Sequence, residues 1–154
     1  MANAQPLHHR KRGFFYEHSL SIASSAVLLL WICLYLISDP STHLGSFFGN
    51  AIADWSGTVV MILATKYLYE KGSTESRRLP KTILRPALEW MRDHSLTLFL
   101  VITGIGWVVL YIRMDSEGKW GQVVGNVVSE WTQIFGVVLM TKRLIERRSK
   151  ESKE

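Results

Sequence analysis

Two stretches of this chain decide its fold: HSLSIASSAVLLLWICLYLISD, residues 18–39, and HSLTLFLVITGIGWVVLYIRMD, residues 94–115. They are two copies of one pattern, separated by a constant 76 residues. The alignment runs without a gap between residues 13–78 and 89–154, and nineteen of its 66 positions are identical. The identical pairs include His18/His94, Trp31/Trp107, Asp39/Asp115, Gly45/Gly121, Asn50/Asn126 and Thr65-Lys66/Thr141-Lys142. The sequence therefore predicts a duplicated structural unit.

Charged residues are concentrated between long apolar runs. The runs Leu20–Ser38 and Leu96–Ile112 contain no Asp, Glu, Lys or Arg. A bilayer core of ~30 Å requires about 20 helical residues, so each run can span a membrane. Two further runs, Leu44–Tyr69 and Trp120–Ile145, are long enough but contain a few charged residues. We predict transmembrane helices at about 18–38, 46–70, 94–112 and 120–146.

The expected fold is all-α: an integral membrane four-helix bundle made of two tandem two-helix hairpin repeats. Each unit contains two spans, so both units have the same orientation, and a pseudo-two-fold axis along the membrane normal would relate them. Residues 1–12 form a basic arm and 13–78 the first repeat. Residues 79–92 form a link with an interfacial helix that starts near Pro86, and 93–154 form the second repeat with a basic tail.

The positions of the basic residues predict the orientation. Of the 18 Lys and Arg residues, all but Arg113 and Lys119 lie in the arm, the link, the tail or the adjoining helix ends. Because cytoplasmic segments are enriched in Lys and Arg, we expect both termini in the cytoplasm, with a bacterial inner membrane as the setting. Anionic headgroups account for the pI of about 9.5. No segment could form a soluble basic domain, so nucleic acid is not an expected partner.

Polar residues follow one face of the second span of each repeat. The two sets are Asn50, Asp54, Gly57, Met61 and Thr65, and Asn126, Glu130, Gln133, Val137 and Thr141. Because lipid disfavours an outward polar stripe, both stripes are expected to face the bundle interior, with Asp54 and Glu130 near each other. Two such carboxylates would share a proton or hold a cation. The candidate intramembrane site consists of Asp54, Glu130, Asn50, Asn126 and Gln133.

A structural interpretation of these carboxylates stays open. Asp54 and Glu130 each precede a tryptophan, and tryptophan marks the boundary between headgroups and hydrocarbon. If the spans begin at Trp55 and Trp131, each carboxylate is a first-turn residue that complements the helix dipole. The span from Trp55 to Glu70 would then be about 24 Å long, which is short for the core.

A second candidate cluster lies at the cytoplasmic end of the spans. It consists of His18, His94, Thr65, Lys66, Thr141 and Lys142. Histidine titrates near neutral pH, so such a cluster could sense or relay protons. The structural alternative, which we favour, is that Glu17 and Asp93 are helix-start acceptors. In that case Lys66 and Lys142 reach the headgroups and pair with Glu70 and Glu146 at i, i+4.

Motifs for other chemistry are missing from the sequence. There is no Cys/His cluster at metal-site spacing, no glycine-rich phosphate loop and no nucleophile elbow. We therefore expect no enzyme activity, no metal and no cofactor. Haem or quinone binding is a third functional hypothesis, because His18 and His94 come from different helices at matched depth.

Residues 63–77 end in Gly72-Ser73-Thr74-Glu75-Ser76-Arg77, and the C-terminus repeats part of this as Ser149-Lys150-Glu151-Ser152-Lys153. This stretch resembles a family of small uncharacterised bacterial integral membrane proteins, with a Gly-Ser-x-Glu-Ser-Lys/Arg tail after a transmembrane helix. The resemblance implies a bacterial inner-membrane setting and no activity.

Two functional hypotheses follow from the residues themselves. The first is a small polytopic inner-membrane protein that handles protons or ions through the paired intramembrane carboxylates. The alternative is a non-catalytic accessory or scaffold subunit of a larger membrane complex. The expected partners are the lipid bilayer and, for either hypothesis, a second copy of the chain or a larger membrane assembly.

Overall fold

The computed structural model describes residues 13–76 and 85–144, and within these ranges it contains helices and no strands. The all-α prediction is confirmed for this part of the chain. The helices in chain order are α1 (Phe14–Glu17), α2 (Ser19–Ile37), α3 (His43–Tyr67), α4 (Pro86–Asp93), α5 (Ser95–Arg113) and α6 (Lys119–Met140).

Four of these helices, α2, α3, α5 and α6, are long and apolar enough to cross a membrane. Helices α2 and α5 have 19 residues each. That length corresponds to about 28 Å, close to the ~30 Å hydrocarbon core. Only 11% of the most apolar window of each of these two helices is buried inside the protein. Because so much apolar surface is unfavourable in water, lipid is the environment that fits these helices.

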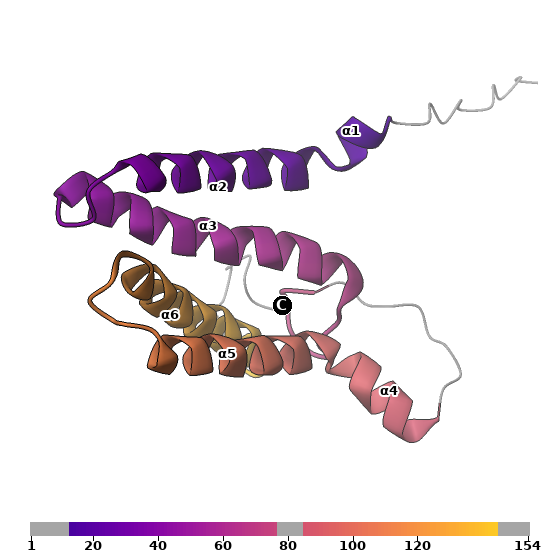
Figure 1. The fold of residues 1–154 in the computed structure, drawn as a ribbon. Coiled ribbons are helices and arrows are strands. Elements are labelled where there is room, and N and C mark those ends of the chain that lie inside the picture. Colours follow the sequence, from indigo (N-terminus) through magenta and orange to yellow (C-terminus); the bar gives the residue numbers. More distant parts are fainter. Residues whose placement is uncertain (1–12, 77–84, 145–154) are drawn as a thin grey trace, which may run out of the picture.

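The spanning helices form two antiparallel hairpins that pack through their second helices (Figure 1). Helix α2 packs on α3, α3 on α6, and α6 on α5. Both hairpin turns lie on the left in Figure 1. This side, at residues 38–42 and 114–118, is termed the turn end. The opposite side, where α2 and α5 begin, is termed the link end. Helices α3 and α6 occupy the centre of the arrangement.

A short helix precedes each hairpin. His18 separates α1 from α2 and has φ −113° and ψ 11°. His94 separates α4 from α5 and has φ −122° and ψ 19°. The two histidines, 76 positions apart, therefore occupy the same kind of backbone break. Helix α4 is the short helix expected near Pro86 in the link, whereas the separate helix α1 was not predicted.

The two hairpin turns have the same construction. A Cβ atom on Gly45 would lie 2.0 Å from the carbonyl oxygen of Asp39, and one on Gly121 would lie 1.9 Å from that of Asp115. Each aspartate side chain accepts a hydrogen bond from the backbone N–H two residues later, at 2.9 and 3.1 Å. Only glycine fits so close to the turn carbonyl, which explains why both glycines recur in the sequence.

Helices α3 and α6 differ from their predicted bounds of 46–70 and 120–146. Helix α3 starts earlier because the Thr42 hydroxyl caps it, accepting the Gly45 N–H at 3.1 Å. It ends at Tyr67, after which the chain turns toward the start of α5. Helix α6 ends at Met140 and is followed by a turn at residues 141–143. Glu70 and Lys142 therefore lie outside the helices.

The main core lies where α3, α5 and α6 meet. Its buried residues are Ala53, Ala64, Leu96, Leu100, Val127, Trp131 and Val138. The indole N–H of Trp131 donates to the Thr103 hydroxyl at 2.9 Å, which satisfies its one polar group. A smaller cluster of Tyr35, Ile52 and Val123 lies nearer the turn end. These two clusters fix the position of α6 against α3.

Candidate functional site

The contact between the hairpins uses a line of small residues on α3. These residues, Gly49, Ala53 and Gly57, recur every four positions and are all buried. Small side chains allow the backbones of two helices to approach closely within a membrane. Ala53 packs in the same cluster as Val127 and Trp131 of α6. The second span of each hairpin thus forms the joint between them.

Asn50 and Asn126 meet within this joint. The Nδ2 atom of Asn126 donates to Oδ1 of Asn50 at 2.5 Å, and the two residues are 76 positions apart. Asn50 lies seven residues beyond the start of α3, which is about 10 Å into the helix. A hydrogen bond between two side-chain amides lowers the free-energy cost of placing both polar groups among apolar helices. These two members of the predicted intramembrane site are in direct contact.

Glu130 lies against α3 at Gly57. A Cβ atom on Gly57 would be 2.7 Å from Cγ and 2.8 Å from Oε1 of Glu130, and 2.9 Å from Cδ1 of Ile134. The Glu130 side chain is half-buried and uses the space that the missing Cβ leaves. Glycine at position 57 therefore makes room for a carboxylate inside the joint.

Asp54 is placed differently from its sequence counterpart Glu130. Its side chain is exposed, so the expectation that it faces the bundle interior is wrong. The reason is that Ala53, which is 1% exposed, faces α6, and the next residue lies about 100° further around a helix of 3.6 residues per turn. Asp54 is still close enough for its charge to act on Glu130.

A cleft of about 310 Å³ opens beside Glu130, between α3 and α6. Its lining residues are Gly57, Thr58, Met61, Glu75, Glu130, Gln133, Ile134 and Val137. Residues with a hydroxyl, an amide and two carboxylates thus line one space between two helices of spanning length. Among the described residues, no hydrogen-bond donor acts on the Glu130 carboxylate. Glu75, which comes from the segment after α3, was not predicted to take part.

The link end holds a buried carboxylate that joins the two hairpins. Glu70 is 0% exposed, although it follows α3 in sequence and lies outside any helix. Its Oε1 atom accepts a hydrogen bond from Nδ1 of His94 at 2.6 Å and also pairs with the Lys142 ammonium. Its Oε2 atom accepts the backbone N–H of Thr97, in the first turn of α5, at 3.2 Å. This arrangement is termed the Glu70 clasp.

The electrostatics of the Glu70 clasp favour the ionised carboxylate. Burial alone would raise the pKa of Glu70, but the hydrogen bonds from Lys142, Thr97 and His94 outweigh it and hold the pKa below its ordinary value. Because a carboxylate only accepts, Nδ1 of His94 carries the proton of this hydrogen bond.

Backbone hydrogen bonds hold the segment that carries Glu70. The N–H of Tyr69 donates to the Ser95 hydroxyl at 2.9 Å, and the N–H of Leu96 donates to the Tyr69 carbonyl at 3.1 Å. The hydroxyls of Ser73 and Thr141 are 2.9 Å apart. The sequence motif that follows α3 therefore docks on the second hairpin.

The lysine pairing expected from sequence is wrong for Lys66 and Glu70. Helix α3 ends at Tyr67, so an i, i+4 pair cannot form on it, and Glu70 pairs with Lys142 of the other hairpin. The Lys66 ammonium instead donates to Nδ1 of His18 at 3.0 Å. The expected pair of Lys142 with Glu146 involves a residue outside the described ranges.

Thr65, the remaining member of the predicted link-end cluster, and the nearby Asp93 have separate positions. The Thr65 hydroxyl donates to the carbonyl of Met61 at 2.6 Å, within its own helix. Asp93 is held by Arg92 at 2.9 Å and by Lys71 at 3.6 Å. The hydrogen bond from Arg92 is the main reason that the pKa of Asp93 lies below its ordinary value. Asp93 thus acts in ion pairs, and no acceptor role for its side chain at the start of α5 is seen.

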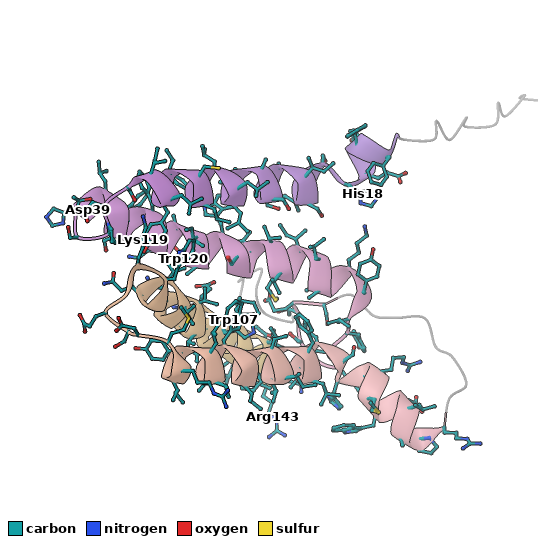
Figure 2. The ribbon with its side chains drawn as sticks, in the orientation of Figure 1. His18, Asp39, Trp107, Lys119, Trp120 and Arg143 are labelled. Carbon is teal, nitrogen blue, oxygen red and sulfur yellow. The ribbon has the colours of Figure 1, made fainter. Side chains whose placement is uncertain are left out.

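A third joint between the hairpins lies at the turn end. The hydroxyl of Tyr35 donates to the carbonyl of Lys119 at 2.5 Å, and the Lys119 ammonium donates to the carbonyl of Ser38 at 2.7 Å. Figure 2 shows Lys119 and Trp120 at this end and His18 at the other end of α2. No sequence pattern pointed to this joint, because the position that matches Lys119 is His43.

Comparisons with known proteins identify no relative: no family model matches the chain, and neither a curated protein nor a solved structure matches it. These comparisons neither support nor oppose the resemblance of residues 63–77 to a bacterial membrane-protein family. Within the described residues, no group of three or more His, Cys, Asp or Glu side chains could hold a metal ion.

Proposed function

We propose that this chain is a small multi-pass membrane protein that handles protons or small cations through the cleft between α3 and α6. The observation that carries this proposal is the position of Glu130, a half-buried carboxylate that lines a cleft of about 310 Å³ between two span-length helices. An ionisable side chain within a membrane is costly, and such residues usually mark an ion or proton pathway.

The chemistry of the cleft supports a hard cation or a proton as its occupant. Thr58, Gln133 and Glu75 supply further oxygen atoms beside Glu130, and oxygen is the ligand that hard cations prefer. A carboxylate that lacks hydrogen-bond donors can take up a proton and become neutral, and it can release the proton when the surroundings change. Glu130 is thus proposed as the binding group, with the exposed Asp54 as an acceptor nearer the turn end.

The orientation and the symmetry belong to the same proposal. The basic residues of the arm, link and tail support a cytoplasmic link end in a bacterial inner membrane. The contact between Asn50 and Asn126 supports a pseudo-two-fold axis that passes through the joint, along the membrane normal. The proposal contains no enzymatic step and no haem or quinone.

The decisive experiment is ion flux through liposomes that contain the purified full-length chain and a pH-sensitive dye. A potassium gradient with valinomycin sets the membrane potential, and proton entry is followed. Glu130→Gln keeps the shape of the side chain but removes the titratable group, so we expect at least about a hundred-fold loss of flux, the lower end of the contribution of single acid–base groups. Asp54→Asn should cause a smaller loss because Asp54 is exposed.

The matched control is Glu117→Gln, which removes one carboxylate from the exposed turn before α6. It should leave flux unchanged. Absence of flux in the parent protein, or equal flux in the parent and Glu130→Gln, would contradict the proposal. Sodium and potassium gradients without a pH gradient then separate proton transfer from cation transfer.

A second candidate, a non-catalytic accessory or scaffold subunit, is favoured by a groove of about 320 Å³ between α5 and α6. Apolar residues such as Leu100, Ile105 and Phe135 line it, and Gly104 lies within it. A partner helix could approach closely there. Gly104→Leu should then reduce the size of the complex seen on native gels in mild detergent. A monomer of unchanged size in both proteins would count against this function.

A further inference from the structure

The two histidines at the link end belong to two similarly built sites. An aromatic ring lies tilted on each imidazole: Phe14 on His18, with centroids 4.4 Å apart at 53°, and Trp90 on His94, 5.2 Å apart at 52°. Phe14 and Trp90 are themselves 76 positions apart. Each histidine occupies the break before a spanning helix, and a lysine from the end of the same hairpin lies within reach.

The site of the second hairpin contains an anion. The Glu70 carboxylate accepts hydrogen bonds from His94 and Lys142 through one oxygen and from the N–H of Thr97 through the other. This anion comes from the other hairpin. A site built from an imidazole, an ammonium and the start of a helix therefore binds a carboxylate within this protein.

In the site of the first hairpin, the two basic groups contact each other. The Lys66 ammonium lies 3.0 Å from Nδ1 of His18. An ammonium has no acceptor, so Lys66 donates and the imidazole carries its proton on Nε2. In this contact the lysine ammonium faces the imidazole of His18, whereas the imidazole of His94 donates to the Glu70 carboxylate. Within the described ranges, no carboxylate pairs with Lys66 or His18, in contrast to the Glu70 clasp.

The surroundings of this site match the headgroup region of a bilayer. It lies where α2 begins and α3 ends, and its aromatic neighbours are exposed: Phe14 is 67% and Tyr67 is 69% exposed. Aromatic residues gather at the membrane–water boundary. We propose that the phosphate of an anionic phospholipid headgroup replaces the direct contact between His18 and Lys66 and accepts hydrogen bonds from both, as Glu70 does from His94 and Lys142.

One neighbouring charge opposes an anion. Glu17 precedes His18, and its counterpart Asp93 is neutralised by Arg92 and Lys71. At the first site the residue that matches Arg92 is Tyr16. Among the described residues, Lys66 supplies the one positive side chain in direct contact with His18, so the affinity depends strongly on Lys66. This assignment is independent of ion handling by Glu130.

The test is native mass spectrometry of the full-length protein in detergent, titrated with phosphatidylglycerol. Lys66→Gln should weaken the first lipid-binding step about five-fold, the factor that about 1 kcal/mol per basic residue near a lipid surface gives. His18→Gln should also weaken it, and Lys66→Arg should keep it. Arg113→Gln removes a positive charge from the exposed turn end and should have no effect.

Several results would overturn the assignment. Equal lipid binding by the parent and Lys66→Gln is one, and equal weakening by Arg113→Gln is another. Competition by millimolar inorganic phosphate would assign the site to free phosphate instead. Stronger lipid binding by Glu146→Gln, absent when Lys66→Gln is also present, would assign the site to the tail of the chain itself. Retained binding by Lys66→Arg guards against loss of folding as the cause.

Discussion

The two hairpins carry matching residues in unlike surroundings. Tyr35 is 1% exposed and donates to the carbonyl of Lys119, whereas its counterpart Tyr111 is 39% exposed. His94 meets a buried carboxylate, whereas His18 meets a lysine. The duplicated sequence thus supplies similar parts, and the packing of one hairpin on the other decides which copy is buried. Substitutions made in matched pairs should therefore have unequal effects.

The largest difference is expected for Glu70→Ala. It removes the carboxylate from a buried ion pair and leaves the partners at Lys142 and His94 uncompensated. A loss of about 3–5 kcal/mol in the free energy of unfolding is expected, measured by reversible unfolding in mixed micelles. Glu17→Ala, an exposed residue with the same charge, should change stability by less than about 0.5 kcal/mol. Equal effects would mean that the Glu70 clasp does not stabilise the joint.

Acid should weaken the same joint. The pKa of Glu70 in the folded protein is below its ordinary value, so its contribution is present above the unfolded pKa of about 4.3. The contribution is lost as the pH falls further, through the folded pKa. Unfolding measured from pH 7 to pH 3 should show a steeper loss below about pH 4 in the parent than in Glu70→Ala. Parallel curves would contradict this explanation.

A smaller and directly paired effect is expected for the histidines. His94→Ala removes a hydrogen bond to a buried carboxylate, which typically contributes about 1.5–3 kcal/mol. His18→Ala removes an exposed contact with Lys66 and should cost less than about 0.5 kcal/mol. Thermal unfolding in detergent at pH 8 compares the two. A larger effect of His18→Ala would reverse the ranking of the two sites.

Substitutions of Tyr35 and Tyr111 should differ in their effect on the free energy of unfolding by about the contribution of one hydrogen bond. Tyr35→Phe loses the bond to the Lys119 carbonyl and should destabilise the protein by about 1 kcal/mol. Tyr111→Phe, at a position that is 39% exposed, should have almost no effect. The same unfolding assay distinguishes them, and equal losses would indicate that the turn-end joint is not specific to Tyr35.

The smallest effect concerns the asparagine pair. A double-mutant cycle of Asn50→Ala and Asn126→Ala should give a coupling of about 0.6 kcal/mol, the average for hydrogen bonds between membrane helices. The control cycle combines Asn50→Ala with Gln133→Ala, a residue on the cleft more than one helical turn from Asn126, and should be additive. Zero coupling in the first cycle would show that the contact between the two amides does not stabilise the joint.

Much of the fold could be predicted because its signals are local and strong. Uncharged runs of spanning length located α2 and α5 to within about a residue at either end. The offset of 76 also selected Asn50 and Asn126, which are in contact. Such signals depend on hydrophobicity and on repetition, both of which can be read from one chain.

The rest depends on contacts between distant residues. A polar stripe defines the direction in which a helix face points only to within about a third of a turn. Asp54 was therefore predicted to face the bundle interior, whereas its neighbour Ala53 faces α6. The Glu70 clasp was missed because α3 ends at Tyr67 and Glu70 finds its partners on the other hairpin. The spacing in the sequence alone suggested that Glu70 pairs with Lys66, four residues earlier. Glu75 in the cleft was missed for the same reason.

The Glu70 clasp also imposes an order on biosynthesis. Glu70 is made before every one of its partners, and Lys142 follows it by 142 − 70 = 72 residues. During that interval the carboxylate lacks its partner Lys142. The Glu70 clasp can close only after α6 and the turn that carries Lys142 have been made. The first hairpin is therefore complete in sequence before Glu70 can meet His94, Thr97 and Lys142 of the second hairpin.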